Sequence, residues 1–159
     1  MKTTIYLLIA AMLLTAALAV PGAAQNQIPL NGTIQGEEIH TGTPPLITAN
    51  CSCAGIGTLV GQLSFNYQLT INLGKGTATG TAQLIAANGD SIFTTVMGSS
   101  DLVSTPGFAV ITEVDTITGG TGRFVGAQGS FSVVRTVSLA TGVTSGSFHG
   151  TITSPGAAH

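Results

Sequence analysis

Three ionisable residues, Glu113, Asp115 and Arg135, fall on faces of predicted strands that are otherwise apolar. The apolar residues at the same alternate positions are Ile111 and Ile117 around the acids, and Phe131, Val133, Val137 and Leu139 around the arginine. A charge in a dry interior is costly unless it is paired, so Arg135 would need Glu113 or Asp115 as a partner. Such a cluster could orient a ligand carboxylate or polarise a carbonyl, which makes these three the candidate catalytic residues. The alternative is that a bulge turns them to a solvated rim.

The two cysteines of the chain, Cys51 and Cys53, are separated by one residue. In an oxidising compartment we expect them to form a disulfide with a structural role. The alternatives are a bridge to another chain and a soft-metal site with His40 or His149. Zinc normally takes four ligands, and two thiols alone do not complete such a site. We therefore expect neither a metal nor a cofactor.

Aromatic residues make up 5% of the chain, and most of them are expected to fill a core. Phe65, Tyr67 and Phe131 lie on apolar strand faces, and together with Arg135 they are the candidates for lining an interior ligand cavity. His40 and His149 have no partners at metal-ligand spacing, so we expect both to be solvated.

A glycine-rich stretch, residues 116–131, separates the acids from the arginine. Its glycines are Gly119, Gly120, Gly122, Gly126 and Gly129. A dinucleotide-binding loop needs a strand before the glycines and a helix after them. Here a strand follows, so the stretch is interpreted as a turn between strands.

The elements that position all of these residues are predicted to be strands. The strongest signal is at 59–73, where apolar and polar residues alternate with a period of two. Further strands are predicted at 77–86, 91–97, 108–117, 130–139 and 146–153. The Asn88-Gly89-Asp90 sequence predicts a tight type I′ hairpin turn.

Short turns and the lack of a helix-length periodic segment indicate antiparallel pairing. Strands with one apolar face must pack as two sheets or close into a barrel. The sequence therefore predicts an all-β fold, a single closed antiparallel barrel of seven to eight strands.

The low charge of the chain excludes several classes of partner. Of 159 residues, 6% are charged and 43% are hydrophobic, with a formal net charge of −2. This composition is that of a folded chain rather than a disordered one. It offers no basic face for nucleic acid and no polybasic patch for anionic lipid.

The first 24 residues have the composition of a cleaved signal peptide. Lys2 is followed by an apolar run from Ile5 to Val20, and Gly22 and Ala24 suit the −3 and −1 positions of a cleavage site. Cleavage after Ala19 is a second possibility, and a membrane anchor is the alternative, although the apolar run is short for a span. We expect a secreted or periplasmic protein with no membrane association after cleavage.

Residues 25–54 are predicted to be an irregular N-terminal segment, with a possible first strand at Ile34–His40 ended by Pro44 and Pro45. Residues 55–153 form the predicted barrel core. Residues 154–159 are predicted to be a frayed tail.

The stretch GGTGRFVGAQG, residues 119–129, resembles the GGTG-x-F-x-x-A-x-G signature of dirigent and allene oxide cyclase-like barrels. The flanking stretches ANGD (87–90) and TGVTSGSFHGTI (141–152) are similar to those of small secreted bacterial members. The resemblance covers residues 55–153. It implies an eight-stranded barrel with an apolar cavity, which in plant relatives holds phenoxy radicals or a fatty-acid epoxide. The catalytic groups of those relatives lie outside the matching block, so none is carried over.

Three functions follow as hypotheses. The first is a secreted barrel, non-catalytic or weakly catalytic, that binds a small hydrophobic molecule in its interior. The second is an isomerase or cyclase acting on an unsaturated lipid or a phenolic substrate, with Arg135 and Glu113 as the residues to test. The third is a structural or adhesive surface protein, favoured by the uncharged Thr- and Ser-rich exterior. Homo-oligomerisation is compatible with each of them.

Overall fold

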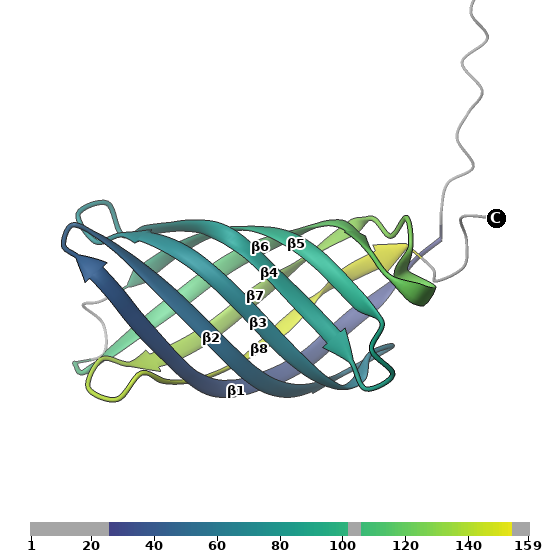
Figure 1. Ribbon diagram of the computed structural model, residues 1–159, viewed down its shortest axis with the longest axis horizontal. Helices are drawn as coiled ribbons and strands as arrows, with labels where there is room; N and C mark the ends of the chain where they lie inside the picture. The colour runs from purple at the N-terminus through teal and green to yellow at the C-terminus, as the bar shows by residue number, and fades with distance from the viewer. Residues whose placement is uncertain (1–25, 102–105, 154–159) are drawn as a thin grey trace, which may run out of the picture.

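The computed structural model describes residues 26–101 and 106–153, so the predicted signal peptide and C-terminal tail lie outside the described residues. The described chain forms a closed barrel in which each strand pairs with its sequence neighbours and β8 returns to β1 (Figure 1). Every pairing is antiparallel. The strands are β1 (Gln27–Thr43), β2 (Leu46–Gly57), β3 (Gly61–Asn72), β4 (Thr77–Ala86), β5 (Ser91–Asp101), β6 (Phe108–Gly120), β7 (Gly129–Ser138) and β8 (Val143–Thr153). The predicted all-β antiparallel barrel is confirmed, with eight strands.

The N-terminal segment differs from its prediction. Residues that we expected to be largely irregular form β1, which has 17 residues, and most of β2. Pro44 and Pro45 make the turn between the two strands, as the prolines suggested. The apolar alternation of β1 is weak because two of its inward positions are Gly32 and Gly36. What makes it a strand is pairing on both edges, with β2 and with β8.

Alternate residues of each strand point into the barrel, as the period-two pattern predicts. In β3 the buried residues are Leu63, Phe65, Tyr67 and Leu69. The register shift in the β5–β6 pairing lies at Phe93 and Thr94, opposite Ile117 and Gly119 of β6, and so falls beyond Glu113 and Asp115 along β6. The alternative in which a bulge turns Glu113, Asp115 and Arg135 to a solvated rim is therefore wrong, and all three side chains are buried.

The two ends of the barrel are built differently. At one end the connection between β6 and β7 contains a 3₁₀ turn, η1 (Gly122–Phe124), and Phe124, Val60 and Ala127 are buried there. We call this the closed end. At the other end lie the β1–β2, β3–β4 and β7–β8 turns (Figure 1). We call this end the mouth.

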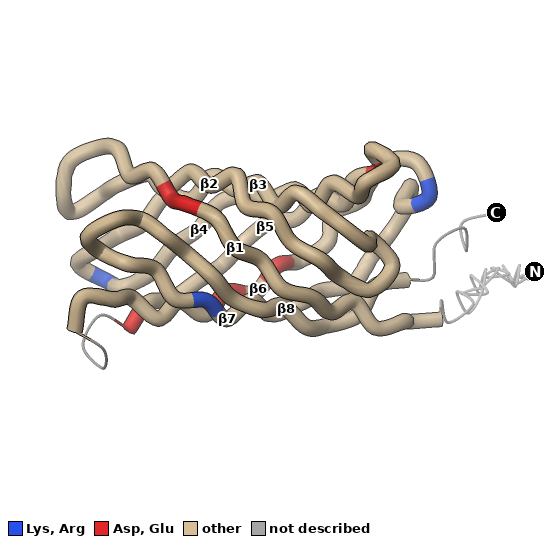
Figure 2. The backbone as a smooth tube through the Cα atoms, turned by 90° about the horizontal axis from the view of Figure 1, so that it is seen from below, with Lys and Arg blue, Asp and Glu red and all other residues tan. Residues whose placement is uncertain are grey.

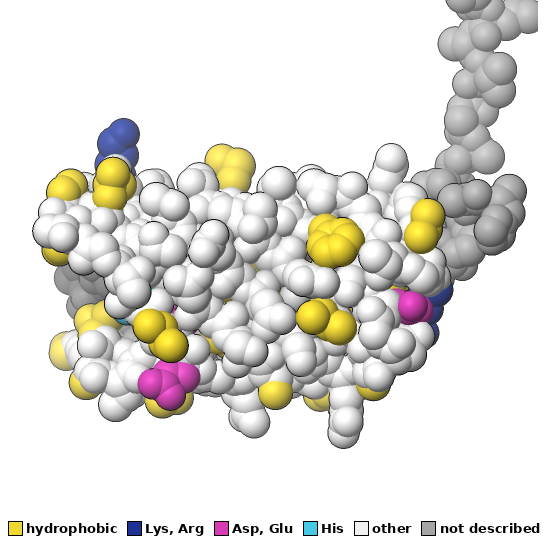
Figure 3. All heavy atoms as spheres, in the orientation of Figure 1, with side chains coloured by type: hydrophobic (Ala, Val, Ile, Leu, Met, Phe, Trp, Pro, Cys, Tyr) yellow, Lys and Arg dark blue, Asp and Glu magenta, His cyan; other side chains and the backbone are white. Residues whose placement is uncertain are grey.

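The outer surface is nearly uncharged. The chain has four Lys and Arg and six Asp and Glu, and Figure 2 shows how few backbone positions carry them. On the face seen in Figure 3, apolar side chains are scattered in small groups among uncharged polar ones. No helix among the described residues is long and apolar enough to cross a membrane.

The glycine-rich connection is locked to the β4–β5 turn by a carboxylate. Asp90 Oδ2 accepts hydrogen bonds from Asn88 Nδ2 at 2.8 Å and from the Arg123 backbone N–H at 3.4 Å. Gly122 has φ +55°, and a Cβ at this position would lie 1.8 Å from Asp90 Oδ1. Gly122 is therefore required both by its backbone conformation and by the carboxylate packed against it.

The β4–β5 turn is not the predicted type I′ turn. Gly89 has φ +88°, whereas Asn88 is not among the described residues with positive φ. The Gly89 N–H donates to the Ala86 carbonyl at 2.9 Å, and the Ala86 N–H donates to the Asp90 carbonyl at 2.8 Å. This pattern fits a type I turn followed by a glycine bulge, the usual three-residue hairpin loop.

The Asp90–Gly122 contact makes a testable prediction about stability. Gly122→Ala should lower the free energy of unfolding by more than Gly61→Ala, because Gly61 has a similar φ of +66° but open space around its Cβ position. The excess should be about 1 kcal/mol for each hydrogen bond that the displaced Asp90 loses. Urea unfolding of the two variants measures it.

The Asp90→Ala background provides the control, because it removes the three atoms nearest to the new Cβ, which all belong to the Asp90 carboxylate. In this background, Gly122→Ala should lower the free energy of unfolding by no more than Gly61→Ala does. An excess that persists in this background would show that the carboxylate is not the cause.

Candidate functional site

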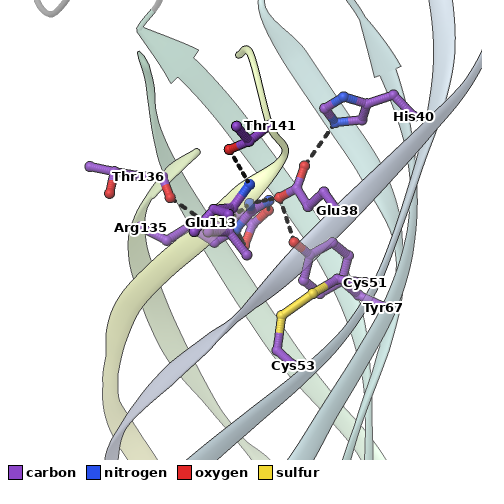
Figure 4. A network of polar contacts seen from close by, with 11 residues as sticks. Glu38, His40, Cys51, Cys53, Tyr67, Glu113, Arg135, Thr136 and Thr141 are labelled. Atoms are coloured by element: carbon purple, nitrogen blue, oxygen red, sulfur yellow. Dashed lines mark hydrogen bonds and ion pairs between the residues drawn. A yellow bond between two sulfur atoms is a disulfide. The ribbon is translucent and has the colours of Figure 1, made fainter. Parts of the chain in front are cut away.

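Arg135 lies inside the barrel and is held by two acids. Its Nε donates to Glu113 Oε2 at 3.1 Å and its Nη2 donates to Glu113 Oε1 at 2.7 Å, which is a bidentate pair. Its Nη1 donates to Glu38 Oε1 and, at 3.4 Å, to Thr144 Oγ1. The side chains of Arg135, Glu38 and Glu113 are at most 2% exposed. The ion pairs therefore lie inside the barrel, and Figure 4 shows the residues around them.

Glu38 is the residue of this cluster that the sequence analysis missed. Its Oε1 also accepts a hydrogen bond from the Tyr67 hydroxyl at 2.5 Å, and its Oε2 lies 2.8 Å from His40 Nε2. Three donors thus converge on one carboxylate, the arrangement that an ionised acid can satisfy. The sequence did carry a signal for Glu38, because alternate residues of a strand share a face, and Glu38 and His40 share theirs with the apolar residues Leu30 and Ile34.

His40, which we expected to be merely solvated, takes part in this network. Its side chain is 36% exposed, whereas that of its partner Glu38 is 2% exposed. Figure 4 shows the Glu38 carboxylate between the imidazole of His40 and Arg135. His40 therefore connects the buried cluster to solvent.

Tyr67 joins the cluster from the opposite wall. The guanidinium carbon of Arg135 lies 4.8 Å from the centre of the Tyr67 ring, a cation–π contact in addition to the shared acceptor Glu38. Burial, followed by the charge of Glu113, raises the pKa of Tyr67. The hydroxyl therefore stays a hydrogen-bond donor to Glu38.

Asp115 is fully buried one step deeper on β6. Its Oδ1 accepts a hydrogen bond from Thr94 Oγ1 at 2.7 Å, while its Oδ2 is buried with no hydrogen-bond partner among the described residues. Burial raises the pKa of Asp115 to about 7, although the bond from Thr94 lowers it. Asp115 does not bond to Arg135, so of the two acids weighed as partners it is Glu113 that makes the pair.

The charge balance of the cluster forces proton retention. Glu38 and Glu113 bond to the guanidinium of Arg135, and Asp115 lies close enough to Glu113 to act on its charge. Burial lowers the pKa of Arg135 to about 10, so the guanidinium stays charged at neutral pH. Burial, followed by the charge of Asp115, raises the pKa of Glu113 to about 8. The hydrogen bonds from Arg135 oppose this shift. Near neutral pH, Glu113 and Asp115 together therefore retain a proton.

Small residues on neighbouring strands make room for these large side chains. A Cβ on Gly98 of β5 would lie 2.9 Å from Glu113 Cγ, and one on Gly146 of β8 would lie 2.4 Å from Arg135 Cβ. Real Cβ atoms do not approach this closely, so both positions are restricted to glycine while the cluster stays in place.

Cys51 and Cys53 are joined by a disulfide along β2, and both sulfur atoms face the barrel interior. Cys51 is the register partner of Glu38 on β1 and of Tyr67 on β3. The bridge therefore packs beside the cluster (Figure 4). No group of three or more His, Cys, Asp or Glu side chains in the described ranges is placed to hold a metal ion.

A cavity of about 120 Å³ lies between the cluster and the mouth. Its ionisable lining residues are Glu38, His40, Glu113 and Arg135, and its uncharged polar ones are Thr77, Ser99 and Ser100. The apolar residues that line it are Ile47, Leu69, Ile71, Leu73, Ala78, Ala109, Ile111, Val137 and Leu139. The barrel is thus hollow toward the mouth and packed toward the closed end.

The predicted cavity residues separate into two groups. Arg135 lines the cavity. Phe65 and Phe131 are 2% exposed and belong to the packed core, where Phe131 contacts Phe148 and Phe65 contacts Tyr67. Tyr67 stands behind Glu38 rather than in the cavity wall. The sequence pattern shows only that these residues point into the barrel. It does not show whether they lie in the packed half or beside the cavity.

Comparison with known proteins supports the fold. No protein-family model matches the chain, and no curated protein matches its sequence. The solved structure of the pterocarpan synthase dirigent protein PsPTS1 superposes with a TM-score of 0.59 at 10% identity, covering 81% of this chain and 96% of that one. The pterocarpan synthase dirigent protein GePTS1 gives a TM-score of 0.58 at 13% identity, covering 96% of this chain and 99% of that one. The chain therefore has a dirigent-like barrel fold, as its glycine-rich stretch predicted.

The retained proton makes a prediction about pH. Burial raises the pKa of the Asp115 carboxyl from its ordinary value of 3.8 to about 7 in the folded chain. Between these values the folded state keeps a proton that the unfolded chain has lost, so stability falls as the pH rises. Asp115→Asn cannot ionise and should lose less stability over this window, by an amount on the order of a few kcal/mol. Urea unfolding from pH 4 to pH 8 measures it.

The matched control is Glu37→Gln, because Glu37 is an exposed carboxyl on β1. This variant should follow the wild-type dependence on pH. If Asp115→Asn also does so, Asp115 is ionised in the folded chain and the charge balance described above is wrong.

Proposed function

We propose that this protein is a secreted barrel that binds a small, largely apolar molecule in the mouth cavity, with a polar group of the ligand directed at the buried acid–arginine cluster. The observation that carries the proposal is the cavity itself, which has apolar walls and one charged side. Pockets that bind small molecules have this composition, with few polar groups to fix the orientation of the ligand.

The volume limits the size of the ligand. An apolar cavity of about 150 Å³ is large enough to bind benzene, and the mouth cavity has about 120 Å³. We therefore expect a ligand portion of one ring to enter, with any remainder extending out of the mouth. A phenolic ring fits both this volume and the need for a hydrogen-bonding group. The structurally similar proteins are named as pterocarpan synthase dirigent proteins, which supports a phenolic ligand.

Secretion is part of the proposal. It is supported by the signal-like composition of residues 1–24 and by the Cys51–Cys53 disulfide, since disulfides persist mainly in oxidising compartments.

An isomerase or cyclase is the second candidate. It is favoured by the cavity wall, which places the His40–Glu38 pair and Glu113, an acid with a pKa raised to about 8, around the same space. A purely structural or adhesive role gives no reason for a cavity with a charged wall.

Filling the cavity tests the binding proposal. Ala109 is 4% exposed and lines the cavity, so Ala109→Phe should place a ring in the space that the ligand needs. We expect phenol to bind the wild-type protein and its affinity to fall at least about tenfold in the variant, through lost contact and steric exclusion. NMR titration of the purified protein with phenol measures both affinities.

Thr79→Phe is the matched control, because Thr79 is exposed on the outer face of β4 beside the lining residue Ala78. It should bind phenol as the wild type does. Equal loss in both variants, or the same affinity in Ala109→Phe as in the wild type, would contradict binding in the mouth cavity.

A further inference from the structure

The His40–Glu38 pair has the geometry of a buried carboxylate that orients an imidazole. His40 Nε2 lies 2.8 Å from Glu38 Oε2, and Glu38 is itself fixed by Tyr67 and Arg135. With Glu38 as the acceptor, Nε2 carries the proton of the neutral ring, and Nδ1 keeps a lone pair. Among the described residues, His40 has no hydrogen bond besides the one to Glu38, so Nδ1 is open to a ligand.

The opposite side of the same cavity carries an acid. Glu113 lines the cavity from β6, across the Arg135 guanidinium from Glu38. One cavity therefore contains an oriented imidazole and a buried carboxyl group. A base and an acid kept in different protonation states within one pocket are the requirements for moving a proton within a bound molecule.

We propose that the mouth cavity is a proton-transfer site, in which His40 is the general base and Glu113 the hydrogen-bond donor for a small cyclic ketone with a β,γ double bond. The inference rests on the proposed function, because the ketone must first bind. Its ring meets the apolar walls, and its carbonyl oxygen faces Glu113 and Arg135.

The reaction is internal to the bound molecule. His40 Nδ1 removes a proton from the carbon between the carbonyl and the double bond, and the electron pair spreads onto the carbonyl oxygen as a dienolate. The charge on that oxygen is stabilised by the Glu113 proton and by Arg135. The imidazolium then returns the proton to the γ carbon, and the double bond moves into conjugation. The molecular formula is unchanged, and no oxidant or cofactor is needed.

Glu38 is a positioning residue in this scheme. It does not contact the reacting carbon. It fixes the orientation of the His40 imidazole and stabilises the imidazolium that forms, as a buried carboxylate does for a catalytic histidine. The other ionisable groups near His40 are Glu113 and Arg135 across the cavity, with Tyr67 and Asp115 behind them.

The test uses cyclohex-3-en-1-one as the probe, a single ring that suits the cavity volume. Conversion to cyclohex-2-en-1-one is followed by the absorbance of the conjugated enone, and binding of the product is measured separately by NMR. We expect the wild type to exceed the buffer rate and His40→Ala to lose about 10²-fold or more of that rate while binding stays within about threefold. His149→Ala, an exposed histidine on the outer face of β8, is the matched control and should keep the wild-type rate.

The pH profile separates positioning from simple stability. The wild-type rate should fall near pH 8 as Glu113 ionises, since burial raises the pKa of Glu113 to about 8. Glu113→Gln, which keeps a donor but cannot ionise, should abolish the fall. Glu38→Gln should lower the rate while product binding stays within about threefold, which loss of stability alone would not do.

The outcomes distinguish the two proposals. Absence of binding overturns the proposed function and with it this inference. Binding without a rate above buffer, or a rate that survives His40→Ala, overturns the proton-transfer site and leaves ligand binding intact.

Discussion

The structure depends on the burial of one guanidinium inside a barrel. An arginine in a dry interior must be paired, and Arg135 is paired with both Glu38 and Glu113. Arg135 is on β7, so its pair with Glu113 joins it to the adjacent strand β6, whereas its pair with Glu38 joins it to β1, which is not its neighbour in the sheet. Such a network is weak evidence for stability, since apolar residues of similar volume often stabilise as well. Its presence is better explained by the cavity whose wall it forms.

The barrel around this cluster is divided by packing. Toward the closed end, Phe65, Phe131 and Phe148 fill the interior, and η1 closes it with Phe124. Toward the mouth the inward residues leave a cavity. The arginine cluster stands at the boundary between the two halves, where one side of each polar group can be satisfied by protein and the other is available to a ligand. Two of its members reach different environments, since Asp115 is fully buried and His40 contacts solvent.

Much of the fold could be predicted from the sequence, because strands with one apolar face show a period of two and the Gly119–Gly129 stretch has a recognisable signature. β1 was largely missed because inward glycines such as Gly36 break that period, and its strand character comes from pairing with β2 and β8. The pairing of Arg135 with an acid of β6 could be anticipated from shared faces. The role of Glu38 was harder to anticipate, because its partners Tyr67 and Arg135 lie on strands far away in the sequence. The role of His40 depends in turn on the position of Glu38.

Two buried carboxyl groups, Glu38 and Glu113, share the Arg135 guanidinium, and Glu113 and the nearby Asp115 together retain a proton at neutral pH. The most direct measurement is NMR titration of protein labelled with ¹³C at the Asp and Glu carboxyl carbons, with Glu38→Gln, Glu113→Gln and Asp115→Asn used to assign the signals. The account predicts that a buried carboxyl belonging to Glu113 or Asp115 titrates near pH 7 to 8, as the pKa values of about 8 and about 7 require. If Glu38, Glu113 and Asp115 all ionise below pH 5, the cluster carries no retained proton and the account is contradicted.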